Sequence, residues 1–551
     1  MEVCAMDGNE MRKNFFLLIV MIMAASGLAV SVWSSEPAVK TRVPNFQTSD
    51  RCVACHNGLA TGAGEDISIG LAWQPTMMAN SARDPYWHAG VRRESIDHPE
   101  SQAVIEDECS VCHMPMARFE SKLGNHEGTV FSHLGFLPDN RGDQLAADGV
   151  SCSLCHQIGK ENLGTRESFV GNFVIGGPNV QGDRQEFGPY SPDAGHVRIM
   201  RSSTGGFSPS ESKHIRQSEV CATCHTLITK ALGQGGKIVG ELPEQVPYQE
   251  WQHSEYREKK SCQSCHMPVV QEDVAITSVQ GVPRTSVSRH VFLGGNFFMS
   301  GILSRYRNEL SVQADPDQFA AGVLKTKEHL QSEAARLIIA MLEERGGRLE
   351  TEVVIENLGG HKLPTAYPSR RVWLHLIVRD KNNRTVFESG AMNATGAIAD
   401  NDNDADAAKF EPHYTEIRSA GQVQIYEAIM ADSSGGVTTG LLNAVRYAKD
   451  NRLLPRGFDK KTAGMDVAVA GSALEDADFG GGADRIRYSI DIGAAQGPFM
   501  IEAELCYQPI GYRWAVNLKN YDAEEPRHFT RYYEAASASS MQVLARAHAE
   551  Q

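Results

Sequence analysis

The chain is poor in basic residues for its size. Its 551 residues include 53 Lys and Arg against 68 Asp and Glu, a formal net charge of −15. A surface that binds nucleic-acid phosphates needs clustered cations, so we expect no nucleic-acid partner. Hydrophobic residues make up 41% of the chain and charged residues 22%, which excludes a globally disordered protein.

Long hydrophobic runs are scarce, which excludes a multi-pass membrane protein. The one such run, residues 15–33, follows Arg12 and Lys13 and precedes small and polar residues, as in a secretory signal. Possible cleavage points follow Ser31 and Ser34. Because the run approaches the roughly 20 residues that span a bilayer, an uncleaved membrane anchor stays open. We assign residues 1–35 to a signal peptide or anchor and expect the rest outside the cytoplasm: in the periplasm, at the inner membrane or exposed at the cell surface.

Cysteine is almost confined to one motif. Ten of the twelve cysteines belong to five Cys-x-x-Cys-His pentads, and the other two are Cys4 and Cys506. We number the pentads one to five in chain order. Their cysteines are Cys52 and Cys55, Cys109 and Cys112, Cys152 and Cys155, Cys221 and Cys224, and Cys262 and Cys265. Their histidines are His56, His113, His156, His225 and His266.

This spacing is the attachment pattern of c-type haem. Two thiols bond the two vinyl groups of one haem, and the adjacent His binds the iron on the proximal side. Zinc sites and disulfides also use paired cysteines, but neither needs a His after every second Cys. The sequence therefore predicts five covalent haem c groups. The pentads span residues 52–266, about 43 residues each, which is too short for separate domains.

The sixth position on each iron needs another ligand. A distal His lowers the haem potential and a distal Met raises it. Met77 and Met78 are alternatives near pentad one, although core packing is the favoured interpretation for them. The candidate distal histidines are His290, just beyond the last pentad, then His214, His196, His88 and His133, and finally His361 in a Gly-flanked loop.

The pentads and the segments around them resemble exported multihaem c-type cytochromes. This group includes the tetrahaem cytochromes c, octahaem hydroxylamine oxidoreductase and pentahaem nitrite reductase. The resemblance covers about residues 48–300 and rests on the pentads, Phe187-Gly-Pro-Tyr190, the His214 to Cys221 spacing and Arg289-His-Val-Phe-Leu-Gly-Gly295. It implies stacked haem pairs, two His ligands on most irons and electron transfer between periplasmic partners. Pentahaem nitrite reductases commonly mark an open iron with Lys in place of the pentad His, and no such variant occurs in this sequence.

Beyond residue 300 the pattern changes. Asp315 and Pro316 begin a predicted amphipathic helix over 316–345 that Gly346 and Gly347 end. Period-2 apolar patterns then predict strands, and the chain ends in a predicted helix over 535–549. The predicted strands are 349–355, 371–379, 385–387, 423–429, 485–490 and 499–507.

Two features of this half concern ligands. Asp400, Asp402, Asp404 and Asp406, with Glu411, follow the oxygen spacing of a calcium loop, but Ala405 replaces the usual Gly and Pro412 blocks a following helix. A solvated acidic loop is therefore favoured over a Ca²⁺ site. Arg370 and Arg371 are candidates to pair with haem propionates.

Together these features predict an α+β multidomain protein. It would have a mainly helical and loop pentahaem cytochrome domain over 41–300, a helical connector over 301–347 and an antiparallel β-sandwich-like domain over 348–551. We favour an electron carrier whose donor is another cytochrome or a quinol-oxidising membrane complex and whose acceptor is unknown. Two alternatives stay open: a multihaem reductase or oxidase of a small nitrogen or sulfur species at one open iron, and a haem wire with a C-terminal partner-binding module.

Overall fold

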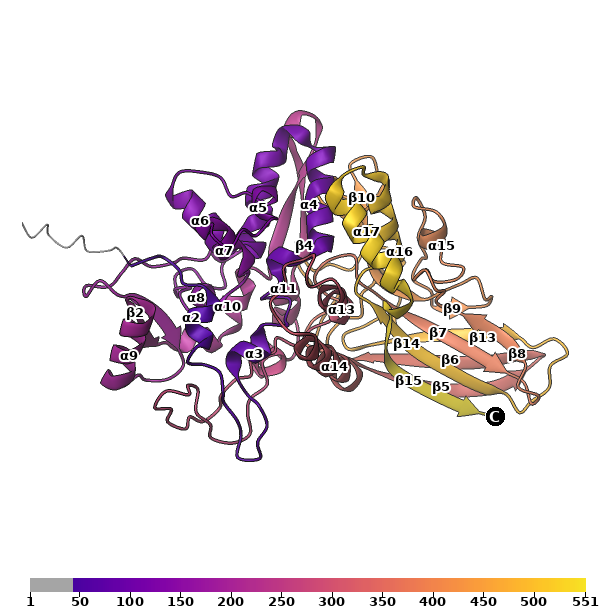
Figure 1. The fold of residues 1–551 in the computed structure, drawn as a ribbon. Helices are drawn as coiled ribbons and strands as arrows, with labels where there is room; N and C mark the ends of the chain where they lie inside the picture. The colour runs from indigo at the N-terminus through magenta and orange to yellow at the C-terminus, as the bar shows by residue number, and fades with distance from the viewer. Residues whose placement is uncertain (1–42) are drawn as a thin grey trace, which may run out of the picture. The chain divides into compact units, whose positions relative to one another are not determined.

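The computed structural model describes residues 43–551 (Figure 1). The predicted signal or anchor over residues 1–35 lies outside this range. Within it, no helix combines the length and the apolar composition that a membrane span requires. Asn45–Gln551 form one compact unit.

Short helices joined by loops carry the pentads. The first Cys of every pentad lies in a helix, and α5 and α12 end at His113 and His266, each followed by Met and Pro. The helices of this part are α2 (Ser49–Val53), α3 (Ile69–Trp73), α4 (Pro85–Asp97), α5 (Gln102–His113), α6 (Pro115–Leu123), α7 (Arg141–Ala147), α8 (Cys152–Cys155), α9 (Ala194–Thr204), α10 (Ser218–Ala222), α11 (Pro247–Gln252), α12 (Cys262–His266) and α13 (Phe297–Arg305).

Two β ribbons that the sequence analysis did not predict also lie in this part. β1 (Arg184–Gly188) pairs in parallel with β2 (Phe207–Glu211). β3 (Leu227–Leu232) and β4 (Ile238–Gln245) form an antiparallel hairpin. The short, Gly- and Pro-interrupted segments that form them carry too little periodicity to be recognised.

The predicted helix over 316–345 is wrong in its second half. Helix α14 is Pro316–Glu333, with the backbone N–H of Asp315 donating to the Gln318 side chain at 2.7 Å, and strand β5 (Ala335–Arg345) follows. In β5, buried Ala335 and Leu337 alternate with exposed neighbours, which is the period of a strand. Gly346 and Gly347, both at positive φ, turn the chain into a hairpin with β6 (Arg348–Asn357) rather than ending a helix.

Two sheets make up most of the C-terminal half (Figure 1). All six predicted strands are present, as β6, β7, β8, β10, β13 and β14. The larger sheet has the order β11-β10-β7-β14-β15, with β12 on β10 and β8 on β7, and the smaller has the order β5-β6-β13-β9. Their remaining bounds are β7 (Arg371–Arg379), β8 (Thr385–Ser389), β9 (Glu416–Ile417), β10 (Ile425–Asp432), β11 (Val437–Thr438), β12 (Ala444–Asp450), β13 (Ala483–Asp491), β14 (Met500–Gln508) and β15 (Gln542–Glu550).

The C-terminal end and one strand pair differ from the prediction. The predicted helix over 535–549 is wrong: α17 (Glu524–Ala536) ends where it was expected to begin, and β15 pairs antiparallel with β14. Sheet pairing outweighs the helix propensity of the Ala-rich tail. β9 and β13 pair in parallel, so the sheets are not purely antiparallel. The short helices α15 (Asp402–Ala405) and α16 (Tyr512–Asn517) complete this half.

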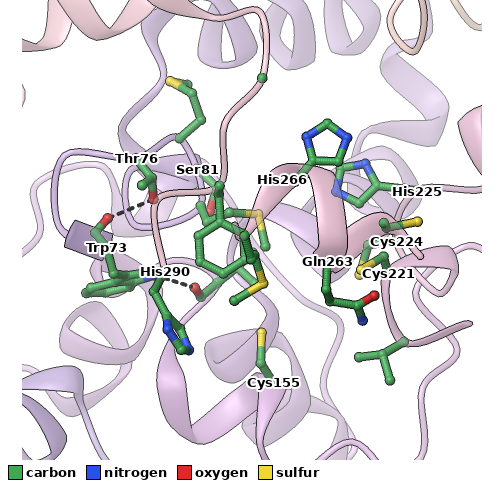
Figure 2. A pocket seen from close by; sticks show the side chains of 18 of the residues that line it. Trp73, Thr76, Ser81, Cys155, Cys221, Cys224, His225, Gln263, His266 and His290 are labelled. Atoms are coloured by element: carbon green, nitrogen blue, oxygen red, sulfur yellow. Dashed lines mark hydrogen bonds between the residues drawn. The ribbon is translucent and has the colours of Figure 1, made fainter. Parts of the chain in front are cut away.

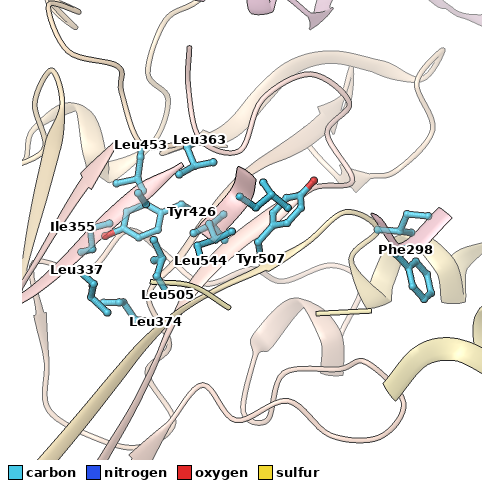
Figure 3. Packing of buried hydrophobic residues seen from close by; sticks show 14 of the residues in the cluster. Phe298, Leu337, Ile355, Leu363, Leu374, Tyr426, Leu453, Leu505, Tyr507 and Leu544 are labelled. Atoms are coloured by element: carbon cyan, nitrogen blue, oxygen red, sulfur yellow. The ribbon is translucent and has the colours of Figure 1, made fainter. Parts of the chain in front are cut away.

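One large apolar cluster packs the two sheets together and includes part of the pentad-bearing half. It combines Leu337 and Ile355 of the smaller sheet with Leu374 and Leu505 of the larger one (Figure 3). Phe298 of α13 belongs to the same cluster, so the predicted domain boundary at residue 300 falls inside a helix that packs on the sheets. α4 and α17 also lie side by side, where Arg92 donates to both Glu525 carboxylate oxygens at 2.9 and 2.7 Å.

The cluster predicts which side-chain truncations lower the stability of the protein most. Leu505→Ala removes a fully buried side chain and should lower the free energy of unfolding by about 2–5 kcal/mol. Glu502→Ala, an exposed position on the same strand, should change it by no more than about 0.5 kcal/mol. Urea unfolding followed by circular dichroism compares the two, and equal midpoints would contradict this packing.

Candidate functional site

One cavity collects all five pentads. Its volume is about 1880 Å³, and every Cys and His of the five pentads lies on its wall, which is mostly apolar. Figure 2 shows part of this wall, with Cys155, Cys221, Cys224, His225 and His266 among the labelled residues. Small-molecule pockets usually measure about 300–1,000 Å³. The site is therefore large enough for several flat ligands side by side and exceeds what one small substrate needs.

The pentads do not form the alternative cysteine structures. All eleven cysteines in the described range are free thiols, so the pentads make no disulfide there. Within the same range, three potential metal-ligand atoms converge in one place alone, at His413, Asp476 and Asp484, away from every pentad. A structural zinc site, the kind that paired cysteines form, needs four converging protein ligands. The cysteines and histidines of all five pentads instead open onto one shared cavity.

Four pentad histidines are oriented by backbone carbonyls. A carbonyl can only accept, so Nδ1 carries the proton and Nε2 keeps its lone pair. This is how proteins orient a metal-binding imidazole. The pairs join Nδ1 of His56 to Ile276 O (2.6 Å), His113 to Ser81 O (2.9 Å), His156 to Phe187 O (2.6 Å) and His266 to Leu293 O.

Burial also holds several of these rings in the neutral form that binds metal. Burial lowers the pKa of His113 and of His225 to about 4, and it lowers the pKa of His56 and His156 as well. Each of these four rings is therefore neutral at neutral pH and can bind a metal without first losing a proton.

Two predicted distal candidates face a pentad histidine across the cavity. The ring centroid of His290 lies 6.3 Å from that of His156 with 23° between the planes, and that of His361 lies 6.2 Å from that of His266 with 13°. Two imidazoles on opposite sides of one metal, each bonded at about 2 Å, place their centroids roughly 6 Å apart. Nδ1 of His290 bonds to Ser288 O (3.2 Å) and Nδ1 of His361 to Lys362 O (2.9 Å). Among the described residues neither Nε2 has a hydrogen-bond partner.

The other four candidates are placed differently. His196 lines the cavity, but its ring nitrogens contact Asp193 and Gln280 O. His214, His88 and His133 are not on the cavity wall. His214 uses both ring nitrogens, with Ser212 at 2.6 Å and Ile158 O at 2.8 Å. His88 Nε2 contacts Ala82 O at 2.7 Å, and His133 Nδ1 contacts Asp143 at 2.7 Å.

His329 is a further histidine of the cavity wall, which the sequence did not predict. It lies on α14, lines the cavity, and its ring centroid is 6.4 Å from that of His266 with 59° between the planes. The available signal was a stripe of small and polar residues at helical spacing, Ala321, Lys325 and His329, which also lines the cavity. The apolar residues that predict this connector helix do not mark the stripe. Met77 and Met78 line the cavity as well.

Electrostatic coupling shows which pentads are neighbours. The Cys152 thiol, with burial, raises the pKa of Cys52, which joins pentads one and three. In the same way Cys224 raises the pKa of Cys112, joining pentads two and four, and Cys262 raises that of Cys221, joining four and five. Burial and then Cys224 raise the pKa of Cys155 to about 12, which places pentad three beside four. Figure 2 shows His225 of pentad four beside His266 of pentad five.

The acidic loop over residues 400–411, for which solvation is favoured over Ca²⁺ binding, is partly buried. Asp404 is buried and pairs with Arg371 at 2.8 Å, so the loop is not simply solvated and Arg371 does not face the cavity. Glu411 accepts from the Asp402 N–H at 3.1 Å and the Tyr414 hydroxyl at 2.5 Å. No three carboxylates of this loop converge within the described residues. Arg370 does line the cavity.

The buried His413 cluster is a hydrogen-bonded network. His413 Nδ1 accepts from the amides of Gln424 (2.9 Å) and Asn451 (3.1 Å), so Nε2 carries the proton and donates to Asp476 at 3.0 Å. The nitrogen that faces the carboxylates therefore has no lone pair for a cation. Asp484 accepts from the Tyr426 hydroxyl at 2.7 Å.

Comparisons with known proteins give one structural match. No family model matches the sequence, and no curated protein matches it. Among solved structures, a penta-heme cytochrome c552 from Thermochromatium tepidum is similar, with a TM-score of 0.50 and 13% sequence identity over 92% of this chain and 99% of that chain. The fold of this chain is thus similar to that of a multihaem cytochrome c.

Proposed function

We propose that this protein is an exported pentahaem cytochrome c that transfers electrons through five covalently bound haems. The observation that carries the proposal is the single cavity onto which all fifteen pentad Cys and His residues open. The fold shared with a penta-heme cytochrome supports it. When bound, haem supplies reversible one-electron chemistry at iron.

The chain's own residues fit five such groups. The two thiols of each pentad are three residues apart in or beside a helix, so they can reach two points on one macrocycle edge. The carbonyl-oriented imidazoles supply proximal ligands. For the distal positions we assign His290 to the iron of pentad three and His361 to that of pentad five, from the paired ring geometry.

The order of the pentads in space gives a route. Neighbouring pairs are one and three, three and four, four and two, and four and five. Pentad four is the branch point, so electrons entering at pentad one would reach pentad three, then four, and divide toward two and five. We propose a cytochrome or quinol-oxidising complex as donor, consistent with the export pattern of the sequence.

A reductase or oxidase is the second candidate, and the wall near pentad two favours it. Burial and then the charges of Glu244 and Glu94 raise the pKa of the Cys109 thiol, and both carboxylates are buried side chains on the cavity wall. Burial raises the pKa of Glu244 to about 7. Tyr367 lines the same cavity. Such groups can deliver protons to a small substrate at an open iron.

Haem content and coordination test the proposal directly. The purified holoprotein should contain five haems per chain by pyridine haemochrome and by intact mass. As a carrier, it should show only low-spin ferric haem by low-temperature EPR and bind no carbon monoxide when reduced. A chain with fewer haems contradicts the proposal, and one high-spin, carbon-monoxide-binding iron selects the enzyme instead.

The distal assignment at pentad three predicts a change in potential. His290→Met should raise the potential of one haem, because Met in place of His raises it, by a fraction of the roughly 0.8 V that axial ligands span. His196→Gln is the control, because His196 lines the same cavity with both nitrogens already bonded. A spectroelectrochemical titration in which both variants, or neither, shift one haem would refute the assignment.

A further inference from the structure

The loop that carries His361 is held by buried groups from distant parts of the chain. Asn357, fully buried, donates to the carbonyls of His361 (2.8 Å) and Leu453 (3.0 Å). Leu363 and Leu453 exchange two backbone hydrogen bonds of 2.9 Å each. A Cβ at Gly360 would come within 3.4 Å of Trp251 and Tyr256, so the loop lies flat against these rings.

Four buried charged residues meet directly behind this loop. We call Glu250, Lys362, Asp450 and Arg452 the buried charge cluster. Arg452 donates to both oxygens of Asp450, at 2.9 and 2.8 Å, and lies 2.9 Å from Glu250 Oε1. Lys362 Nζ donates to Asp450 at 2.7 Å. The two cations and two anions balance, which lets all four be buried.

Glu250 connects the cluster to two residues that follow His361 in the loop. Its Oε2 accepts from the Lys362 N–H at 3.1 Å and from the Thr365 hydroxyl at 2.5 Å. The Lys362 carbonyl in turn accepts from His361 Nδ1 at 2.9 Å. Lys362 thus donates to the cluster through its N–H and its ammonium group and accepts from the His361 imidazole through its carbonyl. The ring has little freedom to turn away from His266.

The cluster joins the two halves of the chain. Glu250 belongs to α11, twelve residues before pentad five begins, whereas Asp450 ends β12 of the larger sheet. Apolar residues of similar volume often stabilise a protein as well as a buried ion pair does. Stability alone therefore does not explain why charged residues lie at this place. Its placement behind a single cavity-facing imidazole indicates a positioning role.

We propose that the buried charge cluster is a positioning device that fixes His361 as the distal ligand of the iron at pentad five, so that this coordination depends on residues from both halves of the chain. The inference rests on the proposed function, because it presupposes haem at pentad five. It goes further by assigning a role to four residues that do not contact the iron.

His329 is the competing ligand, and geometry separates the two. Both rings lie at similar centroid distances from His266, 6.2 Å for His361 and 6.4 Å for His329. The His361 ring is nearly parallel to that of His266, at 13°, and its Nδ1 is bonded, whereas the His329 ring is inclined by 59° and has no hydrogen bond among the described residues. Only His361 is preorganised.

The test uses the full-length holoprotein and counts carbon monoxide bound per reduced chain, with ferric EPR alongside. His361→Ala should bind one more carbon monoxide than wild type and gain one high-spin signal, and added imidazole should abolish both changes. Glu250→Gln combined with Lys362→Met removes one charge of each sign and leaves the Arg452–Asp450 pair. This double variant should also bind extra carbon monoxide, in part or in full, although it retains His361.

Matched controls separate positioning from general disturbance. Glu427→Gln combined with Lys449→Met makes the same change at another buried pair (3.0 Å) that is not on the cavity wall, and it should bind no additional carbon monoxide. His329→Ala should behave in the same way. If the Glu250 and Lys362 variant fails to accumulate, Thr365→Val, which removes one hydrogen bond to Glu250 and no charge, should still give fractional extra binding.

The outcomes distinguish the two proposals. Fewer than five haems in the wild type would refute the proposed function itself. Five haems with no change in His361→Ala, or a change in His329→Ala alone, would overturn the ligand assignment. A change in His361→Ala without one in either the cluster variant or Thr365→Val would overturn the positioning role.

Discussion

The structure depends on one spatial constraint: all five pentads open onto a single cavity of about 1880 Å³. The chain around this cavity brings ten thiols and five imidazoles together from segments far apart in the sequence. The wall is mostly apolar, and protein interiors are close-packed. Large flat apolar groups suit such a space, and the thiols and imidazoles on the wall mark where each would attach.

The constraint explains the helices and loops of the pentad-bearing half. Helices such as α8, Cys152–Cys155, are too short to be stable alone. They present two thiols to the cavity and orient a histidine, whose Nδ1 in four of the five pentads donates to a backbone carbonyl. The C-terminal sheets contribute a rigid support, and through the loop at His361 they also reach the cavity wall. On this account the two halves are one redox unit, and the multidomain description stays a prediction about the chain's organisation.

Local chemistry was predictable from the sequence, and long-range pairing was not. The pentads could be singled out by their fixed spacing, His290 by its place just beyond the last pentad and His361 by its Gly-flanked loop. The same reasoning also named His88, His133, His196 and His214, whose ring nitrogens bond to other groups. Strand β5 was mistaken for helix because Leu337, Ile338, Met341 and Leu342 fit a helical period as well as a sheet period, and only pairing with β6 decides between them. The ion pair of Arg371 with Asp404 and the buried charge cluster join residues far apart in the chain, which no local pattern reveals.

The most direct test of the central claim is the location of iron in the holoprotein by anomalous diffraction at the iron edge. The account predicts five iron positions inside this one cavity, each beside one pentad histidine, with the iron of pentad four nearest to three others. The irons of pentads three and five should lie between His156 and His290 and between His266 and His361. Fewer irons, or irons outside the cavity, would contradict the account.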